Sequence, residues 1–374
     1  MELELKKECL DTYEAGEPQT LTQEETTETI VPDYCPDIAR IISAEGVVCL
    51  HGGAEQEGIS GTVRVTVLYT PENETGVRAL EFAMPFTVQG EGLADCAHVS
   101  AETEIELLES RMLNPRKIFT RCKLVTHLTG YRKVCLTISA DAEAEPGQRV
   151  EKRCCGQNVT LLRQVAEKDL TFSETMSLSL GRDGAAELLH CRTGGTVTET
   201  KVIGNKLIFK GVFLVAVLYR TTGGQLASAS SELPFSQIME IDSIGESAQV
   251  SMRLQITGAD IQIDGADDEG RQLAVTIYYH TMALLRESRE VTLLTDLYST
   301  AYELRYEPCQ LDLCSLYDAV TRRQTVREVL EIGVAAESIL SLCADCGAVS
   351  VSREGDTTQL RTAVTVRALY LDEG

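Results

Sequence analysis

A nine-residue apolar segment that occurs three times limits what this chain can fold into. It runs from Gly61 to Tyr69, recurs 150 residues later from Gly211 to Tyr219, and recurs again at residues 362–370. Every second position is apolar in each copy: Val63, Val65, Val67 and Tyr69, then Phe213, Val215, Val217 and Tyr219, then Val364, Val366, Ala368 and Tyr370. This alternation is typical of a β-strand with one buried face. The second copy is apolar on both faces, which predicts a central strand covered on both sides. The chain is therefore predicted to repeat one β-rich module.

The similarity between the copies extends beyond this strand. In the first copy, turn residues 71–76 lead to a segment that ends with Pro85 and Phe86, and in the second, residues 221–224 lead to one that ends with Pro234 and Phe235. Turn residues between two alternating segments predict β-hairpins. Further alternating segments follow at 99–107, 117–139, 249–263 and 272–285.

A short helix is predicted before the repeated strand of each copy, at residues 36–43, 183–189 and 335–342. In the first copy Ile38, Ile41 and Ile42 have the i, i+3, i+4 spacing of one helix face. Pro36 suits the first helical position, and Asp37 complements the positive end of the helix dipole.

These patterns predict a mainly β chain of tandem antiparallel β-sandwich-like modules, each with one short helix. The expected modules span residues 1–150, 151–298 and 299–374. The third is partial, because the sequence stops soon after Tyr370 and lacks the later strands. Either the chain is a fragment, or another chain completes the third module, since an unpaired strand of the buried type would be an exposed edge.

Charge and hydropathy exclude several functions. The chain has 34 Lys and Arg against 57 Asp and Glu, a net charge of -23, and no basic run longer than a doublet. We expect no nucleic-acid partner, because such binding needs a basic surface. The acidic start does not resemble a secretory signal, and the longest apolar run, residues 212–219, is too short to cross a bilayer. We therefore expect a cytoplasmic protein without a transmembrane segment, whose 13 cysteines are reduced and behave as small buried side chains.

Motifs for catalysis and for phosphate or calcium binding are absent or incomplete. No two of the five histidines have the helical i, i+4 spacing of a zinc protease. His51 precedes two glycines, but no Gly-x-Ser-x-Gly elbow accompanies it. The acidic residues between Asp264 and Gly270 do not have calcium-loop spacing, so we interpret them as a hairpin tip. We predict that the chain is not an enzyme and has no catalytic residue, metal ligand or cofactor.

The strongest candidate for a metal or thiol site is the pair Cys343-x-x-Cys346. Structural zinc needs four ligands, and the nearest other cysteines, Cys309 and Cys314, are poorly spaced for it. A redox pair usually opens a helix, whereas this pair follows a predicted one. Structural cysteines are favoured, and a metal- or thiol-dependent module is retained as an alternative. A cell-surface adhesion or carbohydrate-binding β array is a second alternative, disfavoured by the missing export signal.

Asp33 and Asp37 could be considered as a carboxylate pair for acid–base chemistry. Pro32, Pro36 and the apolar residues that follow favour a structural interpretation instead. Asp33 can then bond to the turn backbone, and Asp37 can occupy the first turn of the predicted helix.

Four blocks of the first module resemble the SPOCS domain, which occurs in spore coat and spore-envelope morphogenetic proteins of endospore-forming bacteria, especially clostridia. The blocks are residues 29–42, 61–69, 84–86 and 113–118. The residues that carry this resemblance, all expected to be structural, are Val31, Pro32, Asp33, Pro36, Asp37, Gly61, Tyr69, Pro85, Phe86, Asn114, Pro115, Arg116 and Lys117. The other two modules are interpreted as divergent copies.

The resemblance implies a non-enzymatic structural and interaction protein of spore coat or spore-envelope assembly. It implies synthesis in the mother cell, a place at the forespore or spore surface, and contacts with coat morphogenetic proteins, including the coat ATPase scaffold. Homo-oligomers are also compatible with it. Some relatives end in a LysM module that contacts the partner, and this sequence shows none, which leaves the identity of the partner open. The family supplies no catalytic residue.

Overall fold

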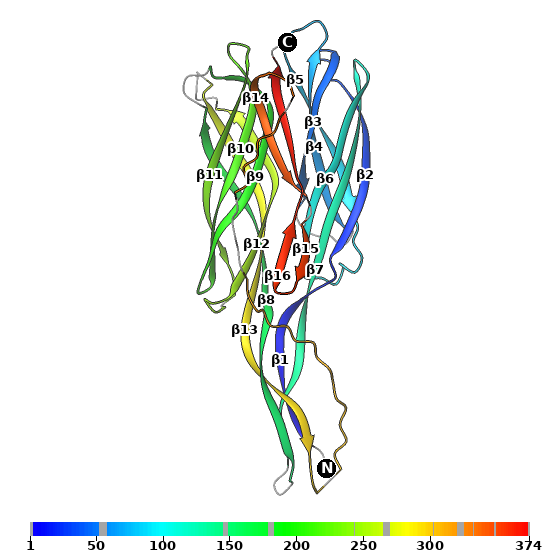
Figure 1. Ribbon diagram of the computed structural model, residues 1–374, viewed down its shortest axis with the longest axis vertical. Coiled ribbons are helices and arrows are strands. Elements are labelled where there is room, and N and C mark those ends of the chain that lie inside the picture. The colour runs from blue at the N-terminus through cyan, green and yellow to red at the C-terminus, as the bar shows by residue number, and fades with distance from the viewer. Residues whose placement is uncertain are drawn as a thin grey trace.

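The computed structural model describes residues 3–51, 58–144, 149–178, 183–242, 244–264, 270–301, 303–319, 325–331, 333–347 and 349–372. Every regular element in these ranges is a β-strand, and all strand pairs are antiparallel (Figure 1). The mainly β class is confirmed. The part of the chain described contains no helix that is long and apolar enough to cross a membrane.

The strands fall into three groups, which we call the first, second and third modules. The first contains β1 (Glu4–Ala15), β2 (Gln19–Ile30), β3 (Ile38–Leu50), β4 (Ile59–Pro71), β5 (Arg78–Val88), β6 (His98–Asn114) and β7 (Lys117–Glu143). The second contains β8 (Glu151–Ser177), β9 (Ala185–Ile203), β10 (Lys206–Thr221), β11 (Leu226–Glu240), β12 (Gln249–Ile263) and β13 (Gln272–Tyr298). The third contains β14 (Ala336–Cys346), β15 (Ser350–Glu354), β16 (Thr357–Arg361) and β17 (Val364–Asp372).

The first two modules are built alike, from two packed sheets. One sheet has three strands, β3–β4–β5 in the first module and β9–β10–β11 in the second. The other is organised around one strand of 27 residues: β7 pairs with β6, β2 and β1, and β13 pairs with β12 and β8. The core lies between the sheets, where Val65 of β4 packs in one cluster with Leu124 of β7, and Val215 of β10 with Tyr279 of β13. In these two modules the buried faces of the repeated strands are thus those that the alternation predicts.

The three predicted helices are wrong, because residues 36–43, 183–189 and 335–342 overlap β3, β9 and β14. In β3 the pairing register with β4 shifts between Ile38 and Arg40 and again between Ile41 and Ser43. A bulge inserts one residue into a strand, so residues three apart can point to the same side. Ile38 and Ile41 therefore both pack on the core while keeping a spacing that resembles that of a helix.

The same two bulges recur at equivalent positions in all three modules. Ile41 is opposite Tyr69, Leu188 is opposite Tyr219, and Ile339 is opposite Tyr370, with a register shift next to each pair. The β14–β17 hairpin is therefore the counterpart of β3–β4 and β9–β10 in its hydrogen-bond register as well as in its sequence.

The first two modules share a narrow extension at the end of the molecule where the N-terminus lies (Figure 1). There β1 and the second half of β7 pack against β8 and β13, burying Leu10, Ile138 and Leu161 in one cluster. The Thr12 hydroxyl donates a hydrogen bond to the Leu162 carbonyl at 3.2 Å. The two modules are thus joined by packed side chains.

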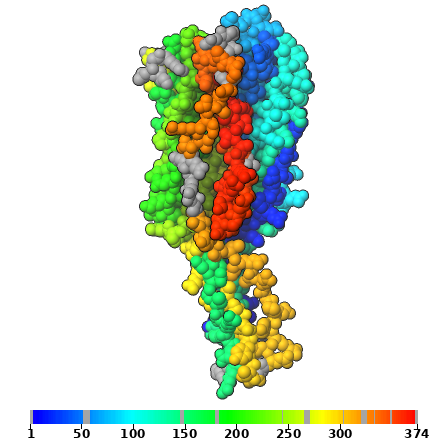
Figure 2. Space-filling view, viewed as in Figure 1, coloured from blue at the N-terminus to red at the C-terminus, as the bar shows by residue number. Residues whose placement is uncertain are grey.

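The third module lies in the seam between the other two (Figure 2). Leu340 of β14 and Leu369 of β17 pack in one cluster with Leu68 of β4 and Leu218 of β10. The second repeated strand, β10, was expected to be covered on both faces. Its outer face is covered only at Leu218, where the third module packs, and Leu214 on the same face is 51% exposed.

Candidate functional site

The turn between β6 and β7 reaches back to the loop that precedes β3, and Arg116 is the centre of this contact. Its guanidinium donates hydrogen bonds to the carbonyls of Val31 and Cys35, both at 2.8 Å. It also pairs with the carboxylates of Asp37 at 3.0 Å and Asp33 at 3.1 Å. Five donors in a planar fork make arginine suited to such a multiple contact. We call these five residues the Arg116 cluster.

Main-chain hydrogen bonds reinforce the Arg116 cluster. The Ile38 amide donates to the Pro115 carbonyl at 2.9 Å, and the Arg116 amide donates to the Asn114 side chain at 2.9 Å. The Tyr69 hydroxyl donates to the Pro36 carbonyl at 3.3 Å. Burial, followed by the neighbouring Cys35, raises the pKa of Tyr69 to about 12, so its hydroxyl remains a donor at neutral pH.

Most of the residues that carry the family resemblance therefore meet in one place. Asp33 and Asp37 share one guanidinium partner, and the helix expected to begin beside Asp37 does not form. This geometry supports a loop anchor rather than an acid–base pair. Lys117 extends the contact through an ion pair with Glu28 of β2.

Gly61, Pro85 and Phe86 lie elsewhere, on the paired strands β4 and β5. Gly61 is opposite Phe86, and a side chain there would place its Cβ 2.5 Å from the Phe86 ring. Gly211 and Phe235 repeat this arrangement in the second module, also at 2.5 Å. The glycine thus leaves room for the aromatic ring that crosses it, which is a packing role.

Cys343 and Cys346 do not converge on a common point. Both lie on β14, with no register shift between them, so residues three apart face opposite sides of the hairpin. Cys343 is buried, and its thiol donates to Asp345 at 3.2 Å, whereas Cys346 is exposed. Burial, followed by the hydrogen bond to Asp345, raises the pKa of the Cys343 thiol. The pair does not have the geometry of a shared metal site.

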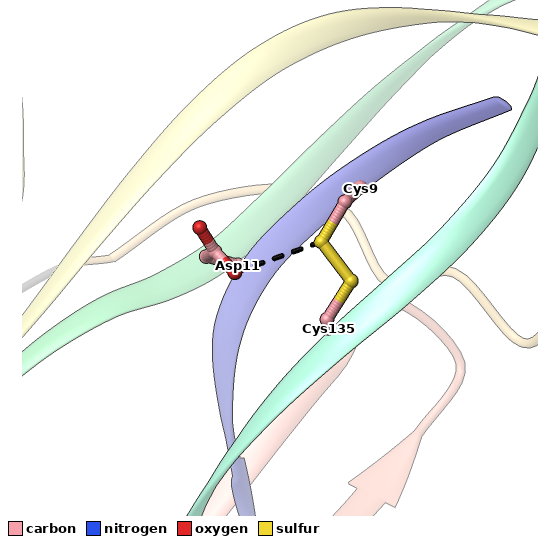
Figure 3. A group of neighbouring side chains, drawn as sticks. All are labelled: Cys9, Asp11 and Cys135. Carbon is pink, nitrogen blue, oxygen red and sulfur yellow. Dashed lines mark hydrogen bonds between the residues drawn. A yellow bond between two sulfur atoms is a disulfide. The ribbon is translucent and has the colours of Figure 1, made fainter.

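Cys9, Asp11 and Cys135 form a convergent group of ligand-type side chains within the described residues (Figure 3). Cys9 of β1 and Cys135 of β7 are joined in a disulfide, and Asp11 Oδ1 lies 3.6 Å from Cys9 Sγ. Sulfurs bonded to each other offer no thiolate to a metal, so in this state the group is a cross-link. The expectation that every cysteine is reduced is wrong for this pair. Five other cysteines are free thiols, as expected, but they are exposed and not buried: Cys154, Cys155, Cys309, Cys314 and Cys346.

A charged junction that the sequence did not reveal connects the three modules. His190 of β9 is hydrogen-bonded to Glu45 of β3 at 3.0 Å. The Arg192 guanidinium of β9 donates a hydrogen bond to the Asp345 carboxylate of β14 at 2.8 Å. Arg367 of β17 also contacts Asp345, at 2.6 Å. The hydrogen bond from His190 lowers the pKa of Glu45, against the opposing effect of burial. These residues are far apart along the chain, so no local pattern marks them.

A cavity of about 430 Å³ lies between the first two modules, lined by residues of β3, β6, β9, β12 and β13. Two of its ionisable side chains have partners within the chain. Arg253 is hydrogen-bonded to Ser100, and His280 to Asp169 at 2.8 Å. These interactions hold the modules and the strands together and do not single out a ligand.

The third module exposes apolar side chains to solvent. Ile339 and Leu342 of β14 are 58% and 66% exposed, and Val364 and Val366 of β17 are 54% and 38% exposed. Their pairing places all four on one face of the hairpin, which we call the β14–β17 face. Contiguous exposed apolar surface is characteristic of interaction sites.

A family model described as the SipL, SPOCS domain matches residues 185–264. The match extends from the start of β9 past the end of β12, which confirms the resemblance to the SPOCS domain. It lies in the second module, whereas the four sequence blocks lie in the first. No curated protein and no solved structure matches the chain. The SPOCS match indicates a sporulation-related protein.

Proposed function

We propose that this chain is a non-enzymatic structural protein of spore coat or spore-envelope assembly, which acts through protein–protein contacts of its β modules. The SPOCS match at residues 185–264 carries the proposal. Two structural features support it. The Arg116 cluster is engaged within the fold, and the β14–β17 face offers apolar surface outside it.

The proposed partners are coat morphogenetic proteins, including the coat ATPase scaffold. The protein would act in the mother-cell cytoplasm, at the surface of the forespore. A net charge of -23 favours a partner with a basic surface over a nucleic acid.

A metal- or thiol-dependent function using Cys343 and Cys346 is less well supported, because these two side chains face opposite sides of β14. The geometry likewise offers no specific observation in favour of a carbohydrate-binding or adhesion array.

A fluorescent fusion in a sporulating cell tests the proposal. We expect a ring or cap on the forespore that appears only after sporulation begins. Diffuse fluorescence in vegetative cells would contradict the proposal and would favour the metal- or thiol-dependent alternative.

A further inference from the structure

Cys9, Asp11 and Cys135 lie together on the exposed face of the strand pair β1–β7 in the extension (Figure 3). Asp11 is directly opposite Cys135 in the pairing register, and Cys9 lies two residues before Asp11, so it points to the same side. One ligand atom of each side chain lies within 4.8 Å of the other two. No other group of three histidine, cysteine or acidic side chains converges this closely within the residues that the structure describes.

The spacing of these atoms suits a tetrahedral zinc ion. Zn²⁺ binds thiolate sulfur at about 2.3 Å and carboxylate oxygen at about 2.0–2.2 Å, so a sulfur and an oxygen on one ion lie about 3.6 Å apart. Asp11 Oδ1 is 3.6 Å from Cys9 Sγ. Two sulfurs on one zinc ion lie about 3.8 Å apart. The Cα atoms of Cys9 and Cys135 are 5.7 Å apart, so rotation of the two side chains can reach this separation once the sulfurs are no longer bonded to each other.

The Asp11 carboxylate is available for a metal ion. It enters no ion pair within the described part of the chain, and the group beside it is Cys9 Sγ. Arg163 of β8 reaches Asp11 through the main-chain carbonyl, at 2.6 Å, and not through the carboxylate. Two thiolates with one carboxylate favour Zn²⁺ over Mg²⁺ and Ca²⁺, because those ions prefer oxygen ligands alone.

Reduction of the disulfide should leave β1 in place, because other contacts hold this strand. All 12 of its residues pair with β7. Leu10 of β1 and Ile138 of β7 point away from the group and are fully buried in the cluster of the extension. The hydrogen bond from Thr12 to Leu162 fastens β1 to β8 as well. The two reduced thiols therefore stay beside Asp11.

The other cysteine pairs that are close in sequence do not offer such a site. Cys154 and Cys155 are consecutive residues of β8, so their side chains point to opposite sides of the strand. Cys343 and Cys346 likewise face opposite sides of β14. Convergence of two sulfurs with a carboxylate arises here from strand pairing and not from local spacing.

We propose that the reduced chain binds one Zn²⁺ through Cys9, Asp11 and Cys135, and that zinc then replaces the disulfide as the link between β1 and β7. A dithiol reductant transfers two electrons and two protons to the two sulfurs and closes into its own disulfide. Zn²⁺ then displaces both thiol protons, because thiolates are the ligands. Water fills the fourth position, since the group is exposed. This inference departs from the expectation that the chain has no metal ligand, and it does not depend on the proposed function.

The test titrates the full chain with Zn²⁺ in competition with a chromogenic chelator. The chain is first reduced with tris(2-carboxyethyl)phosphine, which takes up oxygen from water and leaves as the phosphine oxide. We expect the double variant Cys9→Ser with Cys135→Ser to bind one zinc ion fewer per chain than the unaltered reduced chain. Zinc held by the other exposed thiols cancels in this difference. Cys154→Ser with Cys155→Ser is the matched control and should keep the site, because it also removes two exposed thiols of the extension.

Two further readouts distinguish a metal site from a structural effect of the substitutions. Asp11→Asn keeps both thiols and should weaken zinc binding at least about tenfold, since even residues that only support a metal ligand are worth this much. Zn²⁺ should raise the melting temperature of the unaltered reduced chain, because a ligand that binds the folded state stabilises it. It should not do so for the Cys9 and Cys135 double variant.

Circular dichroism establishes that every variant is folded. Equal zinc binding by the reduced unaltered chain and by the Cys9 and Cys135 double variant would overturn the proposal. So would zinc binding that is as strong before reduction as after it, or zinc binding by Asp11→Asn that is as tight as that of the unaltered chain. Localisation of the protein in a sporulating cell is a separate measurement, so the proposed function stands or falls without this result.

Discussion

At the scale of single residues, Arg116 holds two loops of the first module together. It satisfies two main-chain carbonyls, of Val31 and Cys35, and neutralises two carboxylates, of Asp33 and Asp37. Val31 is fully buried, so its carbonyl cannot turn to water without moving a core residue. The contact connects the start of β3 to the start of β7, which belong to opposite sheets of the module.

Arg116→Ala should lower the free energy of unfolding by about 1–3 kcal/mol, because it leaves two part-buried main-chain carbonyls without their donor. Arg116→Lys should lose less stability than Arg116→Ala, because lysine keeps the positive charge. It should still be less stable than the unaltered chain, because lysine lacks the planar fork of donors. Urea unfolding followed by far-ultraviolet circular dichroism measures both. Arg132→Ala is the control, because Arg132 only reaches Glu14 at 3.9 Å on the surface. Equal stability of Arg116→Ala and this control would contradict the role assigned to Arg116.

At the scale of the elements, the long strands β7 and β13 determine the shape of the molecule. Each passes from a sandwich into the narrow extension, so one strand belongs to two cores. β1 is held to the second half of β7 by antiparallel pairing and by the disulfide between Cys9 and Cys135. The disulfide closes a loop with a sequence separation of 126 residues, which reduces the freedom of the unfolded chain.

Reduction of this disulfide should lower the stability of the extension by about 2–4 kcal/mol. The melting temperature of the unaltered chain should therefore fall when dithiothreitol is added. A double variant, Cys9→Ser with Cys135→Ser, should start at the lower value and show no further response. If dithiothreitol lowers the melting temperature of the double variant by the same amount, the effect comes from other cysteines.

At the scale of the whole molecule, the charged junction and the leucine cluster around Leu68 and Leu218 fix the third module in its seam. Glu45 of the first module and Asp345 of the third both interact with residues of β9 in the second. The pKa of Asp345 is lowered by hydrogen bonds from Arg367 and Cys343, although partial burial, the largest single influence, acts to raise it.

The junction should make stability depend on pH in the acidic range. The folded-state pKa of Glu45 is lowered, so its contribution is complete above the ordinary glutamate pKa of about 4.3 and is lost as the pH falls through the folded value. Glu45→Gln should therefore cost about 1 kcal/mol at neutral pH and less than this at an acidic pH of about 3. Glu28→Gln, which alters an exposed pair with Lys117, should change little at either pH. If the stability difference between Glu45→Gln and the unaltered chain is the same at both pH values, this account is wrong.

The module boundaries can be tested by deletion. A chain without residues 299–374 should stay folded and soluble, because the described strands of both sandwiches and of the shared extension lie before residue 299. Some stability should be lost where Leu68 and Leu218 are uncovered. Circular dichroism and size-exclusion chromatography measure whether the shortened chain is folded. If the deletion unfolds both the first and the second module, the predicted boundaries are wrong.

The sequence by itself determined the repeat and its central strands β4, β10 and β17, and it singled out Val31, Asp33, Asp37 and Arg116 without showing that they meet. A two-residue alternation is a local property, so Val63, Val215 and Val364 reveal it without any knowledge of their neighbours in space. The β3 segment was mistaken for a helix because its bulges arise from pairing with β4, which a one-dimensional pattern does not contain. The disulfide and the junction join residues more than a hundred positions apart. The tertiary structure alone decided that Val364 and Val366 face solvent, because burial of a strand face depends on whether a second sheet is present to cover it.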